Sequence, residues 1–222
     1  EFEPTVARSA ELLHNELDRF EALLTDLLEI SRFDAGAAVL EVEATDLRAC
    51  VDRAVDAHRT LAARKGTRLV VHESAEPVIA DMDSRRIERI LRNLISNAIA
   101  YSPNGSKVSI SRRRRGDNIE IAVTDRGIGI ARADQERVFE RFFRVDKARS
   151  RATGGTGLGL AIVKHVAANH NGTIRLWSQP GTGSTFTLSI PAYSNPADPT
   201  EEEPAERCAD NPDHPAGRPD HH

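Results

Sequence analysis

The sequence of 222 residues predicts an α/β fold, in which a mixed sheet of about five strands lies against three helices and a long helix precedes both. Two observations predict this fold. Segments with apolar residues at helical three- and four-residue steps are interspersed with short β-type runs. Turns rich in glycine separate several of these segments. A core of about 150 residues buries roughly 70% of its unfolded surface, so it needs no disulfide or metal to fold.

Residues 5–33 are expected to form one amphipathic helix that ends before Gly36. Its apolar stripe contains Leu13, Leu17, Phe20, Leu24, Leu27 and Leu28, with Ser31 at the next step. Acidic and basic residues fill the other face. This stretch offers no other element to cover the stripe, so we expect it to pack against a partner helix.

The remaining segments supply the sandwich. Helices are predicted at 46–64, 83–101 and 158–169, the first of them capped by Asp46 and followed by Gly66. Strands are predicted at 68–72, 78–80, 107–113, 118–124, 173–178 and 184–190. The stretch 131–154 is too long for an ordinary connection and is interpreted as a functional lid.

Composition excludes several classes of function. The net charge of −4 gives no general attraction to nucleic acid or to anionic membranes. The basic run from Arg112 to Arg115 lacks aromatic residues for base stacking, so it favours a solvent face or an anionic partner surface over a nucleic-acid patch. No apolar run approaches 18 residues, so no membrane span is expected. Cys50 and Cys208 share no motif and indicate a reduced, cytosolic setting. Residues 193–222 are rich in Pro, Glu and Asp, which predicts a disordered tail.

Two motifs place polar side chains for ligand binding. Asn93 and Asn97 are four residues apart on a predicted helix, so both carboxamides lie on one face. Carboxamide oxygens suit a magnesium ion that also holds phosphate oxygens. Asp125 follows a strand and begins Asp-Arg-Gly-Ile-Gly, where a carboxylate can accept a hydrogen bond from an exocyclic amine such as that of adenine. Taken alone, the asparagine pair is also typical of ordinary helix-surface residues. The Asp-Arg-Gly-Ile-Gly motif is also typical of a common turn.

Two further motifs concern phosphate. Gly155-Thr-Gly-Leu-Gly159 opens a predicted helix, and backbone N–H groups at a helix N-terminus bind anions. Its spacing differs from the dinucleotide-binding fingerprint, and a flexible hinge is an equal alternative when the motif stands alone. Phe139 to Arg144 lies in the lid segment, where aromatic side chains can anchor the loop and arginines can reach phosphate oxygens.

The order and spacing of the four motifs resemble those of the catalytic domain of sensor histidine kinases of two-component systems, of the actinobacterial type. The motifs read NLISNAIAYSP, DRGIGI, VFERFFR and GGTGLGLAI, and the resemblance covers residues 83–191. It implies the two-layer α/β sandwich shared with gyrase and Hsp90. It also implies three regions: 1–40 with the second helix of a partial dimerisation and phosphoacceptor domain, 41–192 as the catalytic ATP-binding domain, and 193–222 as the acidic tail.

The resemblance implies a role for each motif residue. Asn97 and Asn93 would hold Mg2+, and Asn93 and Arg144 would act in catalysis. Asp125 would bind the adenine amine. The residues that would contact ATP are Asn97, Tyr101, Asp125, Gly127, Gly129, Ile130, Gly155, Thr156, Gly157, Leu158 and Gly159. One departure is Ala100, because family members usually carry Lys or Arg three residues after the magnesium asparagine.

The acceptor histidine of the family is missing from this sequence. His14 is followed by Asn15 and Glu16 without a nearby proline, which is typical of a helix-surface residue. The resemblance therefore implies a C-terminal fragment that transfers the γ-phosphate of ATP to a histidine outside it. Its parent would be an inner-membrane protein with this soluble part on the cytoplasmic side, would dimerise through helix 5–33 and would act on a response regulator.

Two alternatives remain within the same fold group. An ATP-hydrolysing member would carry Glu at the position of Asn93, which argues against hydrolysis. A nucleotide-sensing module without phosphotransfer is favoured by Ala100 and by the missing acceptor. A serine-kinase anti-sigma factor shares the fold but lacks a long helix such as 5–33.

Overall fold

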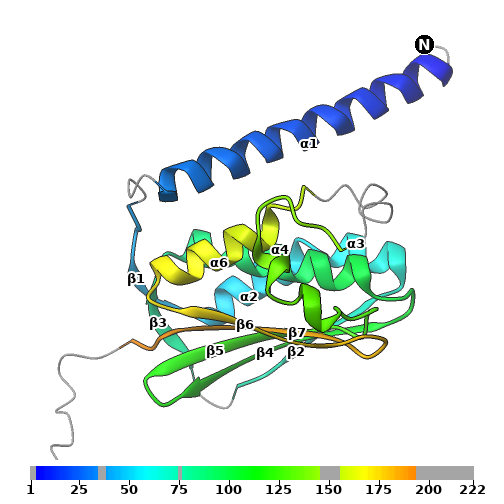
Figure 1. Ribbon diagram of the computed structural model, residues 1–222. Helices are drawn as coiled ribbons and strands as arrows, with labels where there is room; N and C mark the ends of the chain where they lie inside the picture. Colours follow the sequence, from blue (N-terminus) through cyan, green and yellow to red (C-terminus); the bar gives the residue numbers. More distant parts are fainter. Residues whose placement is uncertain (1–3, 35–38, 75–76, 146–155, 194–222) are drawn as a thin grey trace, which may run out of the picture.

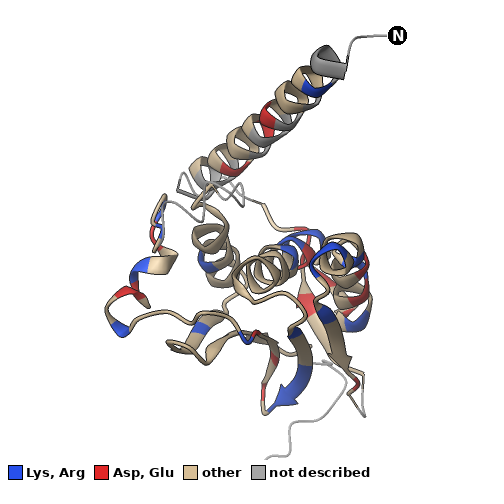
Figure 2. Ribbon diagram, turned by 90° about the vertical axis from the view of Figure 1, so that its right-hand side faces the viewer, with Lys and Arg blue, Asp and Glu red and all other residues tan. Residues whose placement is uncertain are grey.

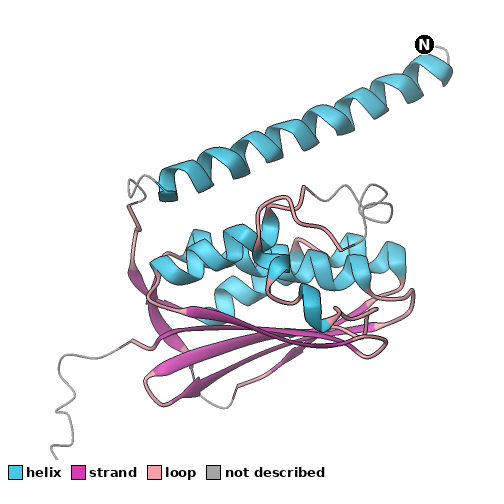
Figure 3. Cartoon of the chain, in the orientation of Figure 1, coloured by secondary structure: helices cyan, strands magenta, loops and turns pink. Residues whose placement is uncertain are grey.

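The computed structural model describes residues 4–34, 39–74, 77–145 and 156–193, and it confirms the predicted α/β sandwich. Helices cover one face of a sheet, and the long N-terminal helix lies above them (Figures 1 and 3). The helices are α1 (Pro4–Asp34), α2 (Leu47–Asp56), α3 (Arg59–Lys65), α4 (Ser84–Tyr101), α6 (Gly159–Asn169) and the 3-10 turns η1 (Arg132–Asp134) and η2 (Arg137–Phe139). The strands are β1 (Glu43–Asp46), β2 (Arg68–His72), β3 (Ile79–Met82), β4 (Lys107–Arg115), β5 (Asn118–Thr124), β6 (Thr173–Gln179) and β7 (Gly183–Pro191).

The main sheet is mixed and has five strands in the order β2-β4-β5-β7-β6. Strand β2 runs parallel to β4, whereas the other pairs are antiparallel. The predicted strand at 78–80 does not join this sheet. As β3, it pairs with β1 in a separate two-stranded ribbon. Strand β1 was not predicted, because its sequence EATD has no alternating apolar pattern.

The core lies between the sheet and the helices. The apolar residues on the inner face of α4 are at most 4% exposed, namely Ile87, Ile90, Leu91, Leu94, Ile95, Ala98 and Ile99. They face the alternate buried residues of the central strands, such as Ile110, Ile121 and Leu188. Because this stripe faces the core, the opposite polar side of α4 remains available for a site.

The predicted helix at 46–64 is two helices. Asp46 caps the first as expected, accepting a hydrogen bond from the backbone N–H of Arg48 at 2.8 Å. After Asp56 the chain tightens, because the N–H of His58 bonds the carbonyl of Val55 three residues back rather than that of Ala54. The His58 ring nitrogen contacts the Ala54 carbonyl instead, at 2.8 Å. The amphipathic pattern continued through this break and therefore did not reveal it.

Helix α1 confirms that residues 5–33 form one helix, and part of its surface is covered by the rest of the chain. Leu23 packs against the core, and Asp26 forms an ion pair with Arg89 of α4. Other described apolar residues of α1 are exposed: Leu12, Leu13, Leu17, Phe20, Leu24, Leu27 and Leu28. Among the described helices, none is long and apolar enough to cross a membrane. Residues 146–154 of the predicted lid and the tail from 194 onward lie outside the described residues.

Candidate functional site

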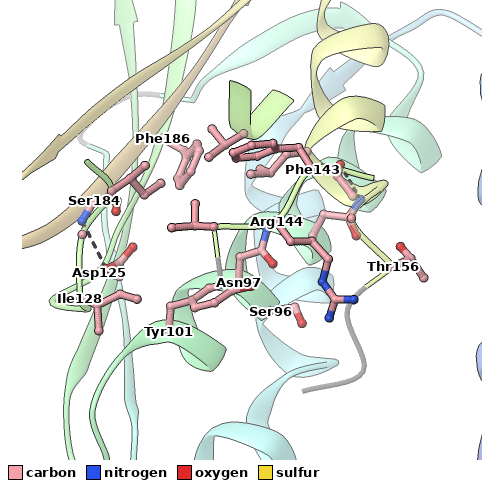
Figure 4. Close-up of a pocket in the computed structure, with 18 of the residues that line it drawn as sticks. Ser96, Asn97, Tyr101, Asp125, Ile128, Phe143, Arg144, Thr156, Ser184 and Phe186 are labelled. Atoms are coloured by element: carbon pink, nitrogen blue, oxygen red, sulfur yellow. Dashed lines mark hydrogen bonds between the residues drawn. The ribbon is translucent and has the colours of Figure 1, made fainter. Parts of the chain in front are cut away.

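A cavity of about 450 Å³ lies where the polar side of α4, the loop after β5 and the first turn of α6 meet. This volume falls within the range of small-molecule sites. The close-up in Figure 4 shows side chains from all four motifs around the same space. The lining residues extend from Asp26 to Phe186, so the fold brings distant parts of the sequence together here.

Helix α4 contributes Asn93, Ser96, Asn97 and Tyr101 to the cavity wall. The Asn93 side chain also joins α4 to α6, because its Nδ2 donates to the carbonyl of Gly159 at 3.4 Å. Among the described residues, no group of three or more His, Cys, Asp or Glu side chains is placed to hold a metal ion. The side-chain oxygens of Asn93 and Asn97 on this wall are of a kind that can bind a cation together with oxygens of a ligand.

Asp125 follows the end of β5, and its side chain is anchored in the cavity wall. The residue is 7% exposed. Its Oδ1 accepts hydrogen bonds from the backbone N–H of Gly127 at 2.7 Å and of Ser184 at 3.2 Å. Burial raises the pKa of the Asp125 carboxyl, and these two N–H groups oppose the rise only in part. The result is a fixed acceptor at one end of the cavity.

The two glycines after Asp125 allow the backbone to pass very close to its neighbours. A Cβ atom on Gly127 would lie 2.7 Å from Asp125 Oδ1 and 2.7 Å from the carbonyl oxygen of Tyr101. Gly129 has φ +70, and a Cβ there would overlap the carbonyl of Gln179. Gly129 and Ile130 line the cavity, whereas Gly127 lies behind it and holds the turn in place.

The glycine-rich motif at the start of α6 lies on the opposite side of the cavity. Thr156, Gly157 and Gly159 line it, and Gly157 (φ +77) accepts a hydrogen bond from the N–H of Phe142 at 3.0 Å. The Leu158 side chain is fully buried in the core, and Leu158 is not among the residues that line the cavity. Gly155 lies outside the described residues.

Arg144 enters the cavity from the described part of the lid (Figure 4). Its Nε and Nη2 atoms are buried, and within the described structure neither has a hydrogen-bond partner. A buried guanidinium without an acceptor is costly, so such N–H groups are normally satisfied by a protein group, by water or by a ligand. Arg144 is thus suited to an anionic ligand oxygen in this cavity.

Comparison with known proteins agrees with this geometry. Residues 82–194 match the model of the family described as histidine kinase-, DNA gyrase B- and HSP90-like ATPase. The chain belongs to this family. It is 57% identical over 203 residues to the sensor-like histidine kinase SenX3 of Mycolicibacterium smegmatis, which confirms the resemblance to sensor histidine kinases. The match covers 91% of this chain and 53% of SenX3, so the chain spans about half the length of that relative.

Solved structures agree at the level of the fold. The Acinetobacter baumannii histidine kinase AdeS superposes with a TM-score of 0.71 at 29% identity, over 87% of each chain. The histidine kinase ThkA, solved in complex with the response regulator TrrA, has a TM-score of 0.68 at 21% identity over 87% of this chain and 53% of that chain, which shows the fold alone. Membership of an ATPase family implies that this histidine kinase-like chain binds a nucleotide.

The sequence motifs did not reveal all of the cavity wall of this histidine kinase-like domain. The additional lining residues are Asp26, Ser96, Ile128, Val138, Phe143, Val145, Leu160, Ser184 and Phe186. Five of them lie inside quoted motifs and could have been named from their position, namely Ser96, Ile128, Val138, Phe143 and Leu160. Ser184 belongs to β7, and only the pairing of β7 with β5 brings its N–H to Asp125. Asp26 comes from α1, and no local signal connects it to the site.

Proposed function

We propose that this chain binds ATP with Mg2+ in the cavity and transfers the γ-phosphate to a histidine of an acceptor domain. The observation that carries the proposal is Arg144, which lines the same cavity as Asp125 and Asn97 and whose buried Nε and Nη2 atoms have no hydrogen-bond partner among the described residues. The carboxylate at one end of the cavity can accept a hydrogen bond from the amine of a base. The guanidinium near the glycine-rich motif can donate hydrogen bonds to phosphate oxygens.

Each motif residue has a proposed role in that reaction. Asp125 accepts the adenine amine, with Tyr101 and Gly129 beside the base. Asn97 and Asn93 hold Mg2+, which would neutralise phosphate charge when bound. Arg144 stabilises the transferred group. The residues at the start of α6, Thr156, Gly157 and Gly159, hold phosphate oxygens. Phosphoryl transfer depends chiefly on positioning and on charge neutralisation, which such a set provides.

The proposal extends to the parent protein. Residues 1–40 contribute the second helix of a dimerisation domain, 41–192 form the catalytic domain and 193–222 form a tail. The parent would be a homodimer anchored in the inner membrane with this part on the cytoplasmic side. A response regulator would receive the phosphate. The exposed apolar side chains of α1 support dimerisation, because isolated apolar stripes of this width require a partner.

A nucleotide-sensing module without phosphotransfer is the second candidate. It is supported by Ala100, where related kinases usually carry a basic residue. At this position, the backbone carbonyls of Ile99 and Ala100 accept hydrogen bonds from Lys65 Nζ, at 2.5 and 2.8 Å. The lysine on α3 is thereby tied to the end of α4. Binding without transfer would favour this candidate, and phosphate release to water would favour hydrolysis.

Titration of a fluorescent ATP analogue against Asp125→Asn tests the nucleotide site. Loss of the charged acceptor should weaken binding about tenfold or more, the size expected for a hydrogen bond to a charged group. Asp117→Asn, in the hairpin between β4 and β5, is the matched control and should bind as the wild type does. Equal affinities of wild type and Asp125→Asn would remove the adenine assignment.

Transfer itself requires an acceptor supplied separately. Labelled ATP and a dimerisation domain carrying the acceptor histidine should yield phosphohistidine with the wild-type chain. Arg144→Gln should lower the transfer rate by at least about a hundredfold while changing nucleotide affinity less, because its charge acts mainly on the transferring group. Arg132→Gln, an exposed residue of η1, is the control. An unchanged transfer rate in Arg144→Gln would contradict the proposed catalytic role.

A further inference from the structure

The arginine run of β4 divides between the two faces of the sheet. Arg112 is buried and contacts Glu73 at 3.3 Å. Arg113 and Arg115 instead reach Glu120 of β5, on the sheet face away from the helices. Arg175 of β6 reaches the same carboxylate. Because side chains alternate along a strand, this common target places the three arginines on the outer face. We refer to Arg113, Arg115 and Arg175 as the arginine cluster.

A single carboxylate organises the arginine cluster. Glu120 is 4% exposed, and Arg113 lies directly opposite it across the β4–β5 pair. Arg113 donates through Nε and Nη2 at 2.9 and 2.7 Å, Arg115 donates through Nη1 at 3.4 Å, and Arg175 donates through Nη2. These donors lower the pKa of Glu120, with Arg113 the largest cause. The carboxylate therefore stays charged, and three positive charges surround one negative charge.

The cluster is open to solvent and already arranged to receive an anion. The side chains of Arg113, Arg115 and Arg175 are 68%, 66% and 57% exposed, although the buried Glu120 carboxylate holds their guanidinium groups. Each guanidinium carries five N–H donors, and Glu120 occupies only one or two of each. Donors with fixed geometry and excess positive charge suit carboxylates. Figure 1 shows no described helix on this side of the sheet, and Figure 2 shows the run as the blue end of a strand near the lower edge.

The chain leaves the sheet next to this cluster. Pro191, the last residue of β7, pairs with Asn118, and Asn118 pairs with Arg115. The end of β7 thus lies two strands from Arg115, or about 10 Å at the usual strand spacing. The sequence that follows contains Asp198, Glu201, Glu202, Glu203 and Glu206, with no basic residue before Arg207. Backbone hydrogen bonds hold Ala192 and Tyr193, so the tether begins at Tyr193. From there a segment of five to eight residues spans up to about 17–28 Å, so these carboxylates can reach the cluster.

We propose that the acidic segment 198–206 of this chain binds the arginine cluster on the outer face of its own sheet. The cluster has two positive charges beyond those that Glu120 neutralises, and the segment has five negative charges and no positive charge. Individually weak ion pairs suffice, because a short tether holds the segment at an effective concentration on the order of millimolar. Binding built from exposed ion pairs weakens as salt increases.

Two residues of the chain can serve as donor and acceptor positions for fluorescence energy transfer. Trp177 is the single tryptophan, is 57% exposed and lies two residues after Arg175 on the same face of β6. Of the two cysteines, Cys50 is fully buried, so a thiol-reactive acceptor dye on the native full chain should label Cys208, two residues beyond the acidic segment. Energy transfer from Trp177 to the dye then reports how close the segment lies to the cluster.

The full-length labelled chain should show transfer at low salt that falls at least about twofold near 1 M NaCl, where the Debye length is about 3 Å. Replacing Glu201, Glu202 and Glu203 with Gln should lower the low-salt transfer by a similar factor. Arg113→Gln combined with Arg115→Gln should do the same, and Arg115→Gln alone is the milder variant if the double change unfolds the sheet. Arg59→Gln, on the helix side, should change nothing.

Several results would overturn the proposal. One is equal low-salt transfer in the wild-type chain and the tail variant with three Gln residues. Another is a transfer efficiency that falls on dilution, since the tail would then bind a second copy. An unlabelled peptide of residues 198–206 should reduce transfer when added in excess. Displacement by an oligonucleotide but not by this peptide would instead assign the cluster to nucleic acid.

Discussion

At the scale of single residues, the site depends on a carboxylate whose charged form is disfavoured by burial. Asp125 is buried, and two backbone N–H groups supply only part of the solvation that water would give. Its pKa is therefore raised above the ordinary value of 3.8, with burial as the largest cause. In the folded protein the carboxyl takes up a proton at a higher pH than in the unfolded chain. The charged form thus costs stability above the folded pKa, and this cost disappears as the pH falls through it.

Nucleotide binding should follow the same titration. If the charged Asp125 accepts the adenine amine, affinity should be constant near neutral pH and fall as the pH drops through the raised pKa. The fall should begin at a higher pH than an exposed aspartate would produce. A fluorescent ATP analogue is titrated across the acid range against the wild type and against Asp125→Asn. Protonation of the ligand itself affects both proteins equally, so it cancels in the comparison. Parallel pH profiles for the two proteins would contradict the assignment.

Gly129 offers a residue-scale test of the backbone at the site. Gly129→Ala combines a positive φ with overlap between the new Cβ and the carbonyl of Gln179, so we expect a loss of at least ~2 kcal/mol in the free energy of unfolding. Gly116→Ala is the matched control, because Gly116 also has positive φ (+59) but has nothing within 4 Å of the added Cβ. It should lose only about 1 kcal/mol. Equal losses in urea unfolding would show that the contact with Gln179 is unimportant.

At the scale of elements, α4 carries both the core and the site, and its start is held by several groups. Asp83 caps it by accepting from the backbone N–H of Arg86 at 3.1 Å. Its other carboxylate oxygen accepts from the Arg86 side chain and from the N–H of Glu41. The N–H of Asp83 donates to the buried Nε2 of His170 at 3.0 Å, which fixes His170 Nδ1 as the donor to the Val166 carbonyl. The two helices beside the cavity are thereby joined at one end.

Removing this cap should be costlier than removing an exposed one. Asp83→Ala should lower the free energy of unfolding by about 2 kcal/mol, at the upper end for N-caps, because it also leaves the partly buried side chain of Arg86 without its carboxylate. Asp46→Ala, whose capping hydrogen bond is exposed, should cost about 1 kcal/mol. Denaturant unfolding of both variants measures the difference. A smaller loss for Asp83→Ala than for Asp46→Ala would contradict the argument.

The helices and strands also show which parts of the structure can be predicted from the sequence. The buried face of α4 and the five strands of the main sheet follow from local periodicity, which depends only on neighbouring residues. The break after Asp56 and the β1–β3 ribbon do not, because they depend on hydrogen bonds and pairings that leave no periodic signal. The same division holds at the site: Asp125 and Asn97 belong to local motifs, whereas Ser184 reaches the cavity only through strand pairing.

At the scale of the whole molecule, the α/β sandwich buries a core of apolar residues, whereas α1 leaves several of its apolar residues exposed. The described core between sheet and helices is continuous, but Leu17, Phe20 and Leu24 of α1 are 62%, 57% and 42% exposed. Near its C-terminal end, α1 is tied to the domain by Leu23 and by the Asp26–Arg89 ion pair. Exposed apolar side chains in a row on a long helix cost free energy in water, so association that buries them is favourable.

This asymmetry predicts that the chain self-associates through α1. Leu17→Glu combined with Leu24→Glu should shift sedimentation of the full chain toward the monomer, because each charge would have to be buried in the helix pair. Nucleotide affinity should remain within about twofold of the wild type, since neither residue lines the cavity. Leu61→Glu, a similarly exposed leucine on α3 at 44%, is the control and should leave association unchanged. A wild-type chain that sediments as a monomer at all concentrations, or a double variant that associates as the wild type does, would contradict this role of α1. The exposed stripe would then need a partner other than a second copy of this chain.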